Sequence, residues 1–538
     1  MKSCLTQLFV LSAIALLTAS CASTSRLSRP PSADTMPVSP RIRPLNEKEV
    51  MRWGHLDPVR DSVPGMSVER AYAEVMKKRK GQAVIVAVID SGIDLQHEDL
   101  SPLLWVNAGE IAGDGLDNDQ NGYVDDVHGY NFLGESYHEQ LEFTRIVAKK
   151  IGDASLQEKA KALLDRQVAE AKDALTQYAQ IEKLVSLAHQ SLQKKLGKEF
   201  YTLEDLQRYA PANEQETQFV GILSQVIGMG QDIPTTLEEL KAGLTYFQSQ
   251  MDYNLNLDFD GRKPVGDNPY DLSNLGYGNG NPNNQLEEES HGTHVAGIIG
   301  ANRTNKKGGK GVAQQVKIMS LRAVPDGDEY DKDIALAIRY AVDQGAKVIN
   351  ASFGKKLSPN ASWVQEALAY AAAKDVLFVH AAGNDGVDLD NPENSNFPND
   401  QYSQKGGNLD NYISVGALTA SYGPNMVASF SNYGKKGVDI FAPGDKIYST
   451  LPLSNYGLES GTSMAAPAVA GLAAVIRSLY PQLTAVQVKR IIMASGLSVP
   501  LKVLVGDQEL SLSDLCVSGK IANLYTALLL SEKVAAAK

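Results

Sequence analysis

Three short stretches, far apart along the chain, constrain its fold and chemistry most strongly: VIVAVIDSGID around Asp90, SHGTHVAGIIG around His291 and SGTSMAAPAVAG around Ser463. An aspartate, a histidine and a serine together make a hydroxyl nucleophilic at neutral pH, because the histidine takes the serine proton while the carboxylate orients the imidazole and stabilises its charge. The order Asp, His, Ser differs from the Ser, Asp, His order of α/β-hydrolases and the His, Asp, Ser order of chymotrypsin-like enzymes.

The residues around these stretches predict the scaffold. Residues 83–89 form a continuous apolar, β-branched run, which is typical of a strand buried on both faces of a parallel sheet. Asp90 follows at the carboxyl end of that strand, where open α/β sheets bind their ligands. Residues 464–479 are apolar and rich in small side chains, and they predict a buried helix with Ser463 at its N-terminus. We therefore expect an α/β fold with a doubly wound, mostly parallel sheet.

Two of the stretches are specific enough to indicate a family. His-Gly-Thr-His-Val-Ala-Gly at 291–297 and Gly-Thr-Ser-Met-Ala-Ala-Pro at 461–467 each match the pattern of subtilisin-like serine peptidases, the subtilases, and they occur in the order of that family. The resemblance covers about residues 50–135 and 255–500. It implies a serine-type endopeptidase that acts on protein or peptide substrates, with a triad of Asp90, His291 and Ser463 and no cofactor for the chemistry.

Two further segments extend the resemblance. Residues 376–384 form an apolar strand that delivers Asn384 to the same edge of the sheet. The resemblance implies that the Asn384 side-chain amide and the backbone N–H of Ser463 bind the oxyanion of the tetrahedral intermediate. It also implies a segment that pairs with the substrate backbone by strand addition, made of Ser352, Phe353 and Gly354.

Composition limits the kinds of binding partner and the cellular compartment that we expect for this chain. The chain has 538 residues and a net charge of −12, which argues against a nucleic-acid partner because such a partner requires a basic surface. Of its three cysteines, Cys4 would leave with a signal peptide and Cys21 would be lipidated. We expect the remaining one, Cys516, to pack as a small hydrophobic residue without a disulfide partner.

The N-terminal sequence predicts that the protein is located in the cell envelope. Lys2 is followed by an apolar stretch from Leu8 to Leu17, which is a signal-peptide core and too short to span a membrane as a helix. Cys21 comes directly after small residues and resembles the lipidation site of bacterial lipoproteins. We expect export and anchoring by lipid in the bacterial envelope, at the outer membrane. The alternative is an ordinary signal peptide cleaved elsewhere within residues 19–23.

A long insertion separates Asp90 from His291. Residues 153–196 contain neither Gly nor Pro, and Gly197 supplies a stop signal. Their apolar residues recur three or four positions apart and predict one long amphipathic helix or two abutting ones: Leu156, Leu164, Val168, Leu175, Tyr178, Val185, Leu192 and Leu196. Thr202 with Asp205, and Thr236 with Glu239, predict two further helix starts. We expect a helical subdomain docked on the catalytic core, either as a binding or stabilising arm or as a lid over the cleft.

An acidic segment before the insertion predicts a structural calcium ion. Within residues 117–126, oxygen-bearing side chains stand at positions 1, 3 and 5, with Gly at 6 and a backbone carbonyl at 7, as in the first half of a calcium loop. The candidate ligands are Asp117, Asp119, Asn121, Tyr123, Asp125 and Asp126. The alternative is an acidic turn around Asn-Gly without an ion.

The predicted organisation has four parts. Residues 1–21 are a lipoprotein signal peptide, 22–50 a Ser/Pro-rich tether, 51–134 with 256–538 the catalytic domain, and 135–255 the helical insertion. The alternative function, from a different class, is a catalytically silent envelope lipoprotein that binds a protein partner through the insertion. The sequence does not indicate an oligomeric state.

Overall fold

The structure is a computed structural model that describes residues 41, 43–77, 79–402 and 407–537. The predicted signal peptide, the lipidation site Cys21 and most of the tether lie outside the described residues. The end of the expected tether is folded, because a short helix, α1 (Glu47–Val50), begins there behind the N-cap Asn46.

A nine-stranded sheet organises the main body of the protein. Its order is β12-β15-β9-β8-β5-β4-β1-β3-β2, and every pairing is parallel except that of β12 with β15 at one edge. The strands are β1 (Val84–Asp90), β2 (Gly129–Asn131), β3 (Val316–Arg322), β4 (Val348–Ala351), β5 (Leu377–Ala381), β8 (Tyr412–Leu418), β9 (Ile440–Pro443), β12 (Leu497–Ser498) and β15 (Lys520–Ile521). The sequence prediction of a mostly parallel α/β sheet is confirmed.

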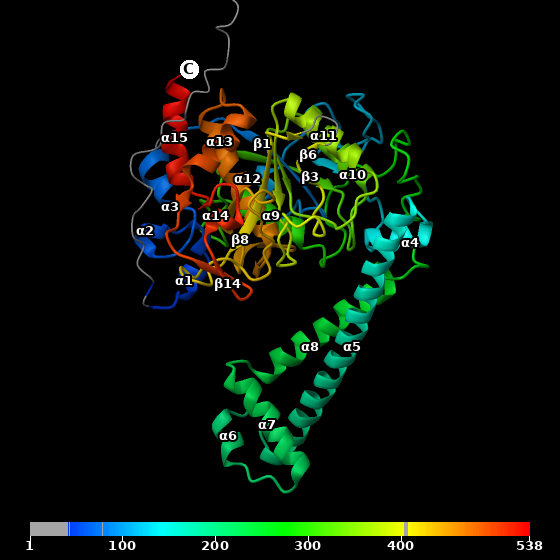
Figure 1. Cartoon of the computed structure of the whole chain (residues 1–538), viewed down its shortest axis with the longest axis vertical. Coiled ribbons are helices and arrows are strands. Elements are labelled where there is room, and N and C mark those ends of the chain that lie inside the picture. The colour runs from blue at the N-terminus through cyan, green and yellow to red at the C-terminus, as the bar shows by residue number, and fades with distance from the viewer. Residues whose placement is uncertain (1–40, 42, 78, 403–406, 538) are drawn as a thin grey trace, which may run out of the picture.

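Helices cover both faces of this sheet (Figure 1). One face carries α9 (His291–Gly300), α12 (Thr462–Leu479), α13 (Ala485–Ser495) and α15 (Leu524–Ala536), and the other carries α10 (Asp331–Asp343) and α11 (Ala361–Ala373). Each face has its own apolar core: α12 packs across β8, β5 and β4 in the first, and α10 and α11 pack on β1 and β5 in the second. The central strands are therefore buried on both sides, as their unbroken apolar sequence predicts.

Smaller elements complete the body. Three hairpins pair β6 (Gln401–Tyr402) with β7 (Gly407–Asn408), β10 (Ile447–Leu451) with β11 (Asn455–Glu459), and β13 (Val503–Val505) with β14 (Gln508–Leu510). The short helices are α2 (Pro58–Asp61), α3 (Val68–Ala71) and α14 (Leu512–Leu515). Cys516 follows α14, is buried and carries a free thiol, as predicted.

Among the described residues, one helix is long and apolar enough to cross a membrane. It is α12, and 89% of its apolar window is buried inside the protein. Its apolarity is therefore used in packing against the sheet and the neighbouring helices.

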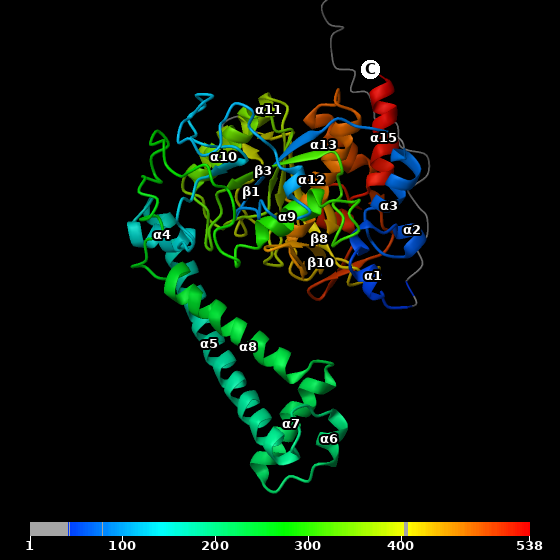
Figure 2. The same cartoon turned by 180° about the vertical axis from the view of Figure 1, so that it is seen from behind.

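The insertion is an extended arm and not a docked subdomain (Figures 1 and 2). It begins with α4 (Glu142–Lys149) and continues into α5 (Ala154–Leu196), a single helix of 43 residues that starts at the N-cap Asp153 and ends at Gly197 in the left-handed conformation. The arm then turns through α6 (Leu203–Arg208) and α7 (Glu214–Gly228) and returns along α5 as α8 (Ile233–Ser249), followed by a π-helical turn, Gln250–Asn254. Both views show its distal helices standing away from the body, so they do not cover the cleft as a lid would.

Of the two helix starts predicted in the arm, one is confirmed and one is wrong. Thr202 and Asp205 form the expected capping box of α6. The start predicted behind Thr236 is wrong, because α8 begins four residues earlier, behind the N-cap Asp232 and with a proline in its first turn. The Asp232 carboxylate accepts from the backbone N–H of Thr235, and proline lacks a donor that the first turn would leave unpaired.

Candidate active site

Asp90 and His291 meet at the carboxyl end of the central strand β1. His291 is the first residue of α9, and its Nδ1 lies 2.7 Å from Oδ1 of Asp90. The same carboxylate oxygen accepts from the backbone N–H of Ser91, while the other oxygen of Asp90 is buried without a hydrogen-bond partner. A buried carboxylate fixed in this way holds the Nδ1 proton, so that Nε2 is the nitrogen able to accept another.

Two close approaches by glycine make this meeting geometrically possible. A Cβ on Gly292 would lie 2.1 Å from the carbonyl oxygen of Gly92, so only glycine lets the first turn of α9 rest on the loop that follows β1. At the other end of the helix, a Cβ on Gly297 would lie 2.1 Å from the Thr450 hydroxyl. The position of the imidazole therefore depends on small residues on the faces of α9 that contact the body.

The electrostatic setting of His291 favours its protonated form. Burial lowers the pKa of His291, but the charge and hydrogen bond of Asp90, with a contribution from Glu459, outweigh burial and raise the pKa to about 9. Glu459 lies at the end of β11 and also accepts from the hydroxyl of Ser290, the residue before the histidine. The pKa of His291 therefore lies above the unperturbed histidine value of about 6.5.

Ser463 lies in the first turn of the buried helix α12, half-exposed. Its hydroxyl donates to the backbone carbonyl of Ser352 at 3.2 Å, and its own carbonyl accepts from the Ser352 hydroxyl at 2.8 Å. The segment after β4 and the start of α12 are thereby tied together. Ser463 and the exposed Gly354, in the segment predicted to pair with substrate backbone, line the same pocket.

Asn384 is held with its amide in a defined orientation. Its carbonyl oxygen accepts from both the backbone N–H and the hydroxyl of Thr462, each at 2.9 Å. Since only the carbonyl can accept, the NH₂ group is left to point away from Thr462, and the residue is exposed. Two donors, the Asn384 amide and the first N–H groups of α12, are thus available at the same edge of the sheet.

Sequence reasoning missed the two residues that orient Asn384. Thr462 donates two hydrogen bonds to the Asn384 side-chain carbonyl, as described above, and buried Asn432 holds the loop that carries Asn384. The Asn432 side chain accepts from the backbone N–H groups of Asp385 and Val387 and donates to the carbonyl of Ala382. Thr462 stands inside a recognised motif, whereas nothing in the local sequence marks Asn432, which is distant in the chain.

A pocket of about 370 Å³ opens beside Ser463 and Asn384. Phe353 and Gly354 line one part of it, as expected for a substrate segment, and the backbone carbonyl of Phe353 is fixed by a 2.7 Å hydrogen bond from His380. Residues of the helical insertion line another part.

The candidate calcium segment forms a carboxylate cluster with a different membership from the predicted one. Carboxylate oxygens of Glu110, Asp119 and Asp126 lie within 4.8 Å of one another. The amide groups of Asn107 and Asn121 each contact Asp119 and Asp126. Burial raises the pKa of Asp126, against the hydrogen bonds from Tyr340 and the two asparagines that lower it.

The remaining predicted ligands are used elsewhere. Asp117 accepts from the backbone N–H groups of Asn121 and Gly122, and Asp125 accepts from those of Gly113 and Gly115, so both carboxylates close turns. The predicted ligand atom of Tyr123 is its backbone carbonyl, and its ring packs against the rings of Tyr130 and Tyr340. Glu110, seven residues before the motif, was missed because no spacing rule includes it.

Comparison with known proteins agrees with the geometry. A family model described as "Subtilase family" matches residues 81–513. The chain is 41% identical over 194 residues to a thermophilic serine proteinase of Bacillus sp. (strain AK1), covering 36% of this chain and 44% of that protein. It is 40% identical over 190 residues to thermitase of Thermoactinomyces vulgaris, covering 35% and 61%. The chain thus spans less than two thirds of the length of these relatives.

Two further similarities complete the comparison. The chain is 36% identical over 211 residues to subtilisin BL of Lederbergia lenta, covering 39% of this chain and 71% of that protein. Among solved structures, a prenylagaramide maturation protease is 28% identical with a TM-score of 0.37, covering 45% of this chain and 82% of that one.

The raised pKa of His291 predicts the pH dependence of Ser463 reactivity. A protonated imidazole cannot accept the serine proton, so the rate of reaction with a fluorophosphonate should rise with pH and reach half its maximum near 9 instead of near 6.5. Glu459→Gln removes one raising charge and should move the midpoint down. Labelling rates measured from about pH 5 to about pH 10 give the midpoint for the wild type and for Glu459→Gln. A wild-type midpoint at about 6.5 that does not change in Glu459→Gln contradicts the prediction.

Proposed function

The chain belongs to the subtilase family, and on that basis we propose that it is a serine endopeptidase that hydrolyses peptide bonds through Asp90, His291 and Ser463. The observation that supports this proposal most directly is the 2.7 Å hydrogen bond between Nδ1 of His291 and buried Asp90. It fixes the tautomer in which Nε2 accepts the proton of a nucleophile.

The reaction begins when the Ser463 hydroxyl turns from the carbonyl of Ser352 towards His291. Nε2 takes the proton as the oxygen attacks the substrate carbonyl carbon, and Asp90 stabilises the imidazolium that forms. The imidazolium then gives its proton to the leaving amine, so the C–N bond breaks and an acyl-enzyme remains. Water, deprotonated by the same histidine, hydrolyses the ester and restores the serine.

The negative charge of the tetrahedral intermediate needs donors that are already in place. The Asn384 NH₂ group and the Ser463 backbone N–H fill this role, because the hydrogen bonds from Thr462 to the Asn384 carbonyl fix which way the amide faces. Substrate backbone adds as a strand along Ser352, Phe353 and Gly354, where Gly354 is exposed.

Covalent labelling tests the proposal and separates it from a catalytically silent partner-binding protein. Wild-type protein should react with a fluorophosphonate and degrade a denatured protein, and Ser463→Ala should do neither. Ser460→Ala is the matched control, since this exposed hydroxyl three residues earlier donates to Asp445 and accepts from the backbone N–H of Lys446. Asp90→Asn should lower turnover about 10⁴-fold, because it favours the wrong tautomer. Unlabelled wild type, or full activity in Asp90→Asn, refutes the proposal.

A lipid anchor at Cys21 would place this activity at the cell envelope, at the outer membrane. The support is the short apolar core before small residues and cysteine. Each buried CH₂ of an acyl chain adds about 0.8 kcal/mol, so several chains give stable anchoring. Native protein should therefore enter the detergent phase on phase separation, and Cys21→Ser should remove it from that phase. Cys4→Ser, within the predicted signal peptide, should change nothing. Native protein found wholly in the aqueous phase contradicts the anchor.

We also propose a structural calcium ion at Glu110, Asp119 and Asp126. The residues fit a hard cation, because three carboxylates converge and one oxygen of Glu110 is buried without a hydrogen-bond partner. The ion would offset the mutual repulsion of these carboxylates and take no part in the chemistry.

Calcium should raise the melting temperature of the Ser463→Ala protein, which cannot digest itself. A ligand that binds only the folded state adds about 2.7 kcal/mol at a hundredfold excess over Kd. Glu110→Gln and Asp119→Ala should abolish the difference between calcium and chelator. Asp114→Asn, an exposed turn residue of the same loop, should preserve it. Identical melting curves with and without chelator rule the ion out.

A further inference from the structure

A second pocket, of about 240 Å³, lies where the N-terminal segment 48–55 packs on the main body. Its lining includes Ile298 of α9 and Ala468 of α12, the two helices that carry the proposed base and nucleophile. A more open pocket of about 480 Å³ adjoins it, because the same three residues line both: Val50, Met51 and Tyr448. Together the two pockets form one groove beside α1, which we call the α1 groove. Among the described residues, it shares no lining residue with the pocket at the active site.

The accessible surface of the α1 groove is mainly apolar. Met51 and Leu458, which line it, are each 48% exposed. Val50, Ile447 and Tyr448 are partly exposed and line it as well. An apolar chain that lies along these side chains removes their surface from water, which is the main source of affinity in pockets of this kind.

The smaller pocket of the groove also carries positive charge. Lys48, Arg52 and Lys310 line it and are exposed, and the partly buried His55 lines it with them. Arg52 donates to both carboxylate oxygens of Glu69, which offsets its charge. Among the described residues, Lys48 and Lys310 have no ion-pair partner. Two cations are therefore left to interact with a ligand.

The imidazole of His55 lies in the field of these cations. Burial, together with the positive charges of Arg303, Lys310 and Arg52, lowers the pKa of His55 to about 3. The ring is therefore neutral at physiological pH and keeps one N–H that can donate. Within the described part of the chain this ring has no hydrogen-bond partner. A positive potential beside a free donor favours an anionic group.

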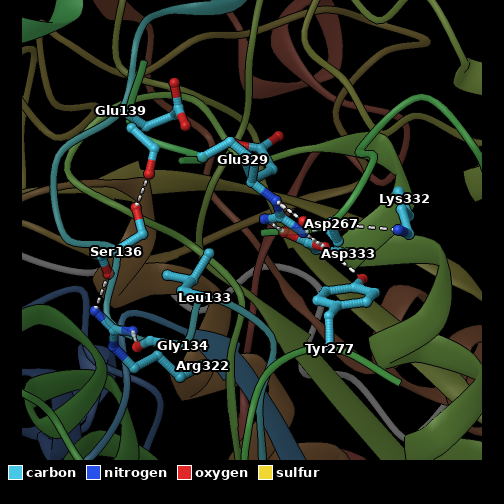
Figure 3. A network of polar contacts seen from close by, with 12 residues as sticks. Leu133, Gly134, Ser136, Glu139, Asp267, Tyr277, Arg322, Glu329, Lys332 and Asp333 are labelled. Atoms are coloured by element: carbon cyan, nitrogen blue, oxygen red, sulfur yellow. Dashed lines mark hydrogen bonds and ion pairs between the residues drawn. The ribbon is translucent and has the colours of Figure 1, made fainter. Parts of the chain in front are cut away.

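Buried charges elsewhere in the protein are matched within the protein, as Figure 3 shows. There Arg322 donates to the carbonyl of Ser136 at 2.7 Å, and Lys332 pairs with Asp267 at 2.6 Å. Such a network satisfies its own polar groups and needs no ligand. The α1 groove differs, because the described residues that line its smaller pocket include several cations and one carboxylate, that of Glu69.

We propose that the α1 groove binds a fatty acid, with the acyl chain along its apolar surface and the carboxylate at His55, Lys48 and Lys310. Charge complementarity selects this ligand: a neutral lipid leaves the cations without a counter-charge, and a cationic amphiphile is repelled by them. The bound chain would contact α9 and α12 through Ile298 and Ala468. The proposal is independent of the proposed peptidase function, because binding requires no residue of the triad.

Calorimetric titration of the full chain with octanoate, decanoate and dodecanoate tests this inference. The protein carries Ser463→Ala so that it cannot digest itself, and each acid is used below its micelle concentration. Each added CH₂ should tighten binding about fourfold until the apolar surface of the groove is covered. Decanol and decylamine should bind about tenfold more weakly than decanoate, because neither brings a negative charge to the cations.

Two pairs of variants locate the site. Val50→Trp places a ring in the groove and should weaken decanoate binding about fifteenfold, the effect of about two buried CH₂ groups. Val59→Trp adds the same ring at a partly exposed position of α2 that lines neither pocket, and it should bind as the parent does. Lys310→Gln should weaken decanoate binding up to about fivefold and leave decanol binding unchanged. Lys306→Gln, an exposed position of the same loop that lines neither pocket, is its control.

Three outcomes overturn the proposal. The first is the absence of saturable binding for all three acids. The second is equal affinity for decanoate and decanol, which means that the groove has no anion site; this comparison needs no groove variant and decides the matter even if Val50→Trp does not fold. The third is decanoate binding that neither Val50→Trp nor Lys310→Gln weakens, because the acid then binds elsewhere on the protein.

Discussion

The placement of the serine depends on one buried helix. α12 packs against β1, β4, β5, β8 and β9 and against α9, so its N-terminus cannot move without disturbing most of the first core. This position is open to it because its buried face is rich in alanine and carries Gly471, where a Cβ would lie 2.8 Å from a Val312 side-chain carbon. Close packing at this density turns a sequence of small residues into a rigid support for Ser463.

The position of His291 depends on a second helix, α9, which brings the imidazole to the same edge of the sheet as Ser463. α9 approaches β1 at Gly292 and β10 at Gly297, and the hydroxyls of Ser449 and Thr450 cap its carbonyls with 2.7 Å hydrogen bonds. These contacts fix the helix from which the imidazole reaches Asp90. Buried charged groups have two effects in this structure. Asp90 raises the pKa of His291. Glu142, Arg145 and Lys355 form ion pairs that fix the base of the arm. The same low polarity that makes such pairs costly to bury also makes them costly to break.

Much of the catalytic body could be predicted from the sequence because its signals are local. The apolar run before Asp90, the motifs at His291 and Ser463, and the uninterrupted helix ending at Gly197 each depend on residues close together in the chain. Prediction failed where two local signals competed, as at α8, where Asp232 followed by proline outranked Thr236. It also failed for the cation cluster, since Glu110 joins Asp119 and Asp126 only through the fold of the loop.

The sequence by itself determined the residue types of the site, their order, the α/β class and the existence of a long helical insertion. Only the tertiary structure decided that the insertion is an arm and not a lid, that its base borders the pocket at Ser463, and that Thr462 and Asn432 orient Asn384. The physical reason is that periodicity and motifs record what each segment buries or caps. Which segments meet, and which charges share a buried volume, follows from packing between residues hundreds of positions apart.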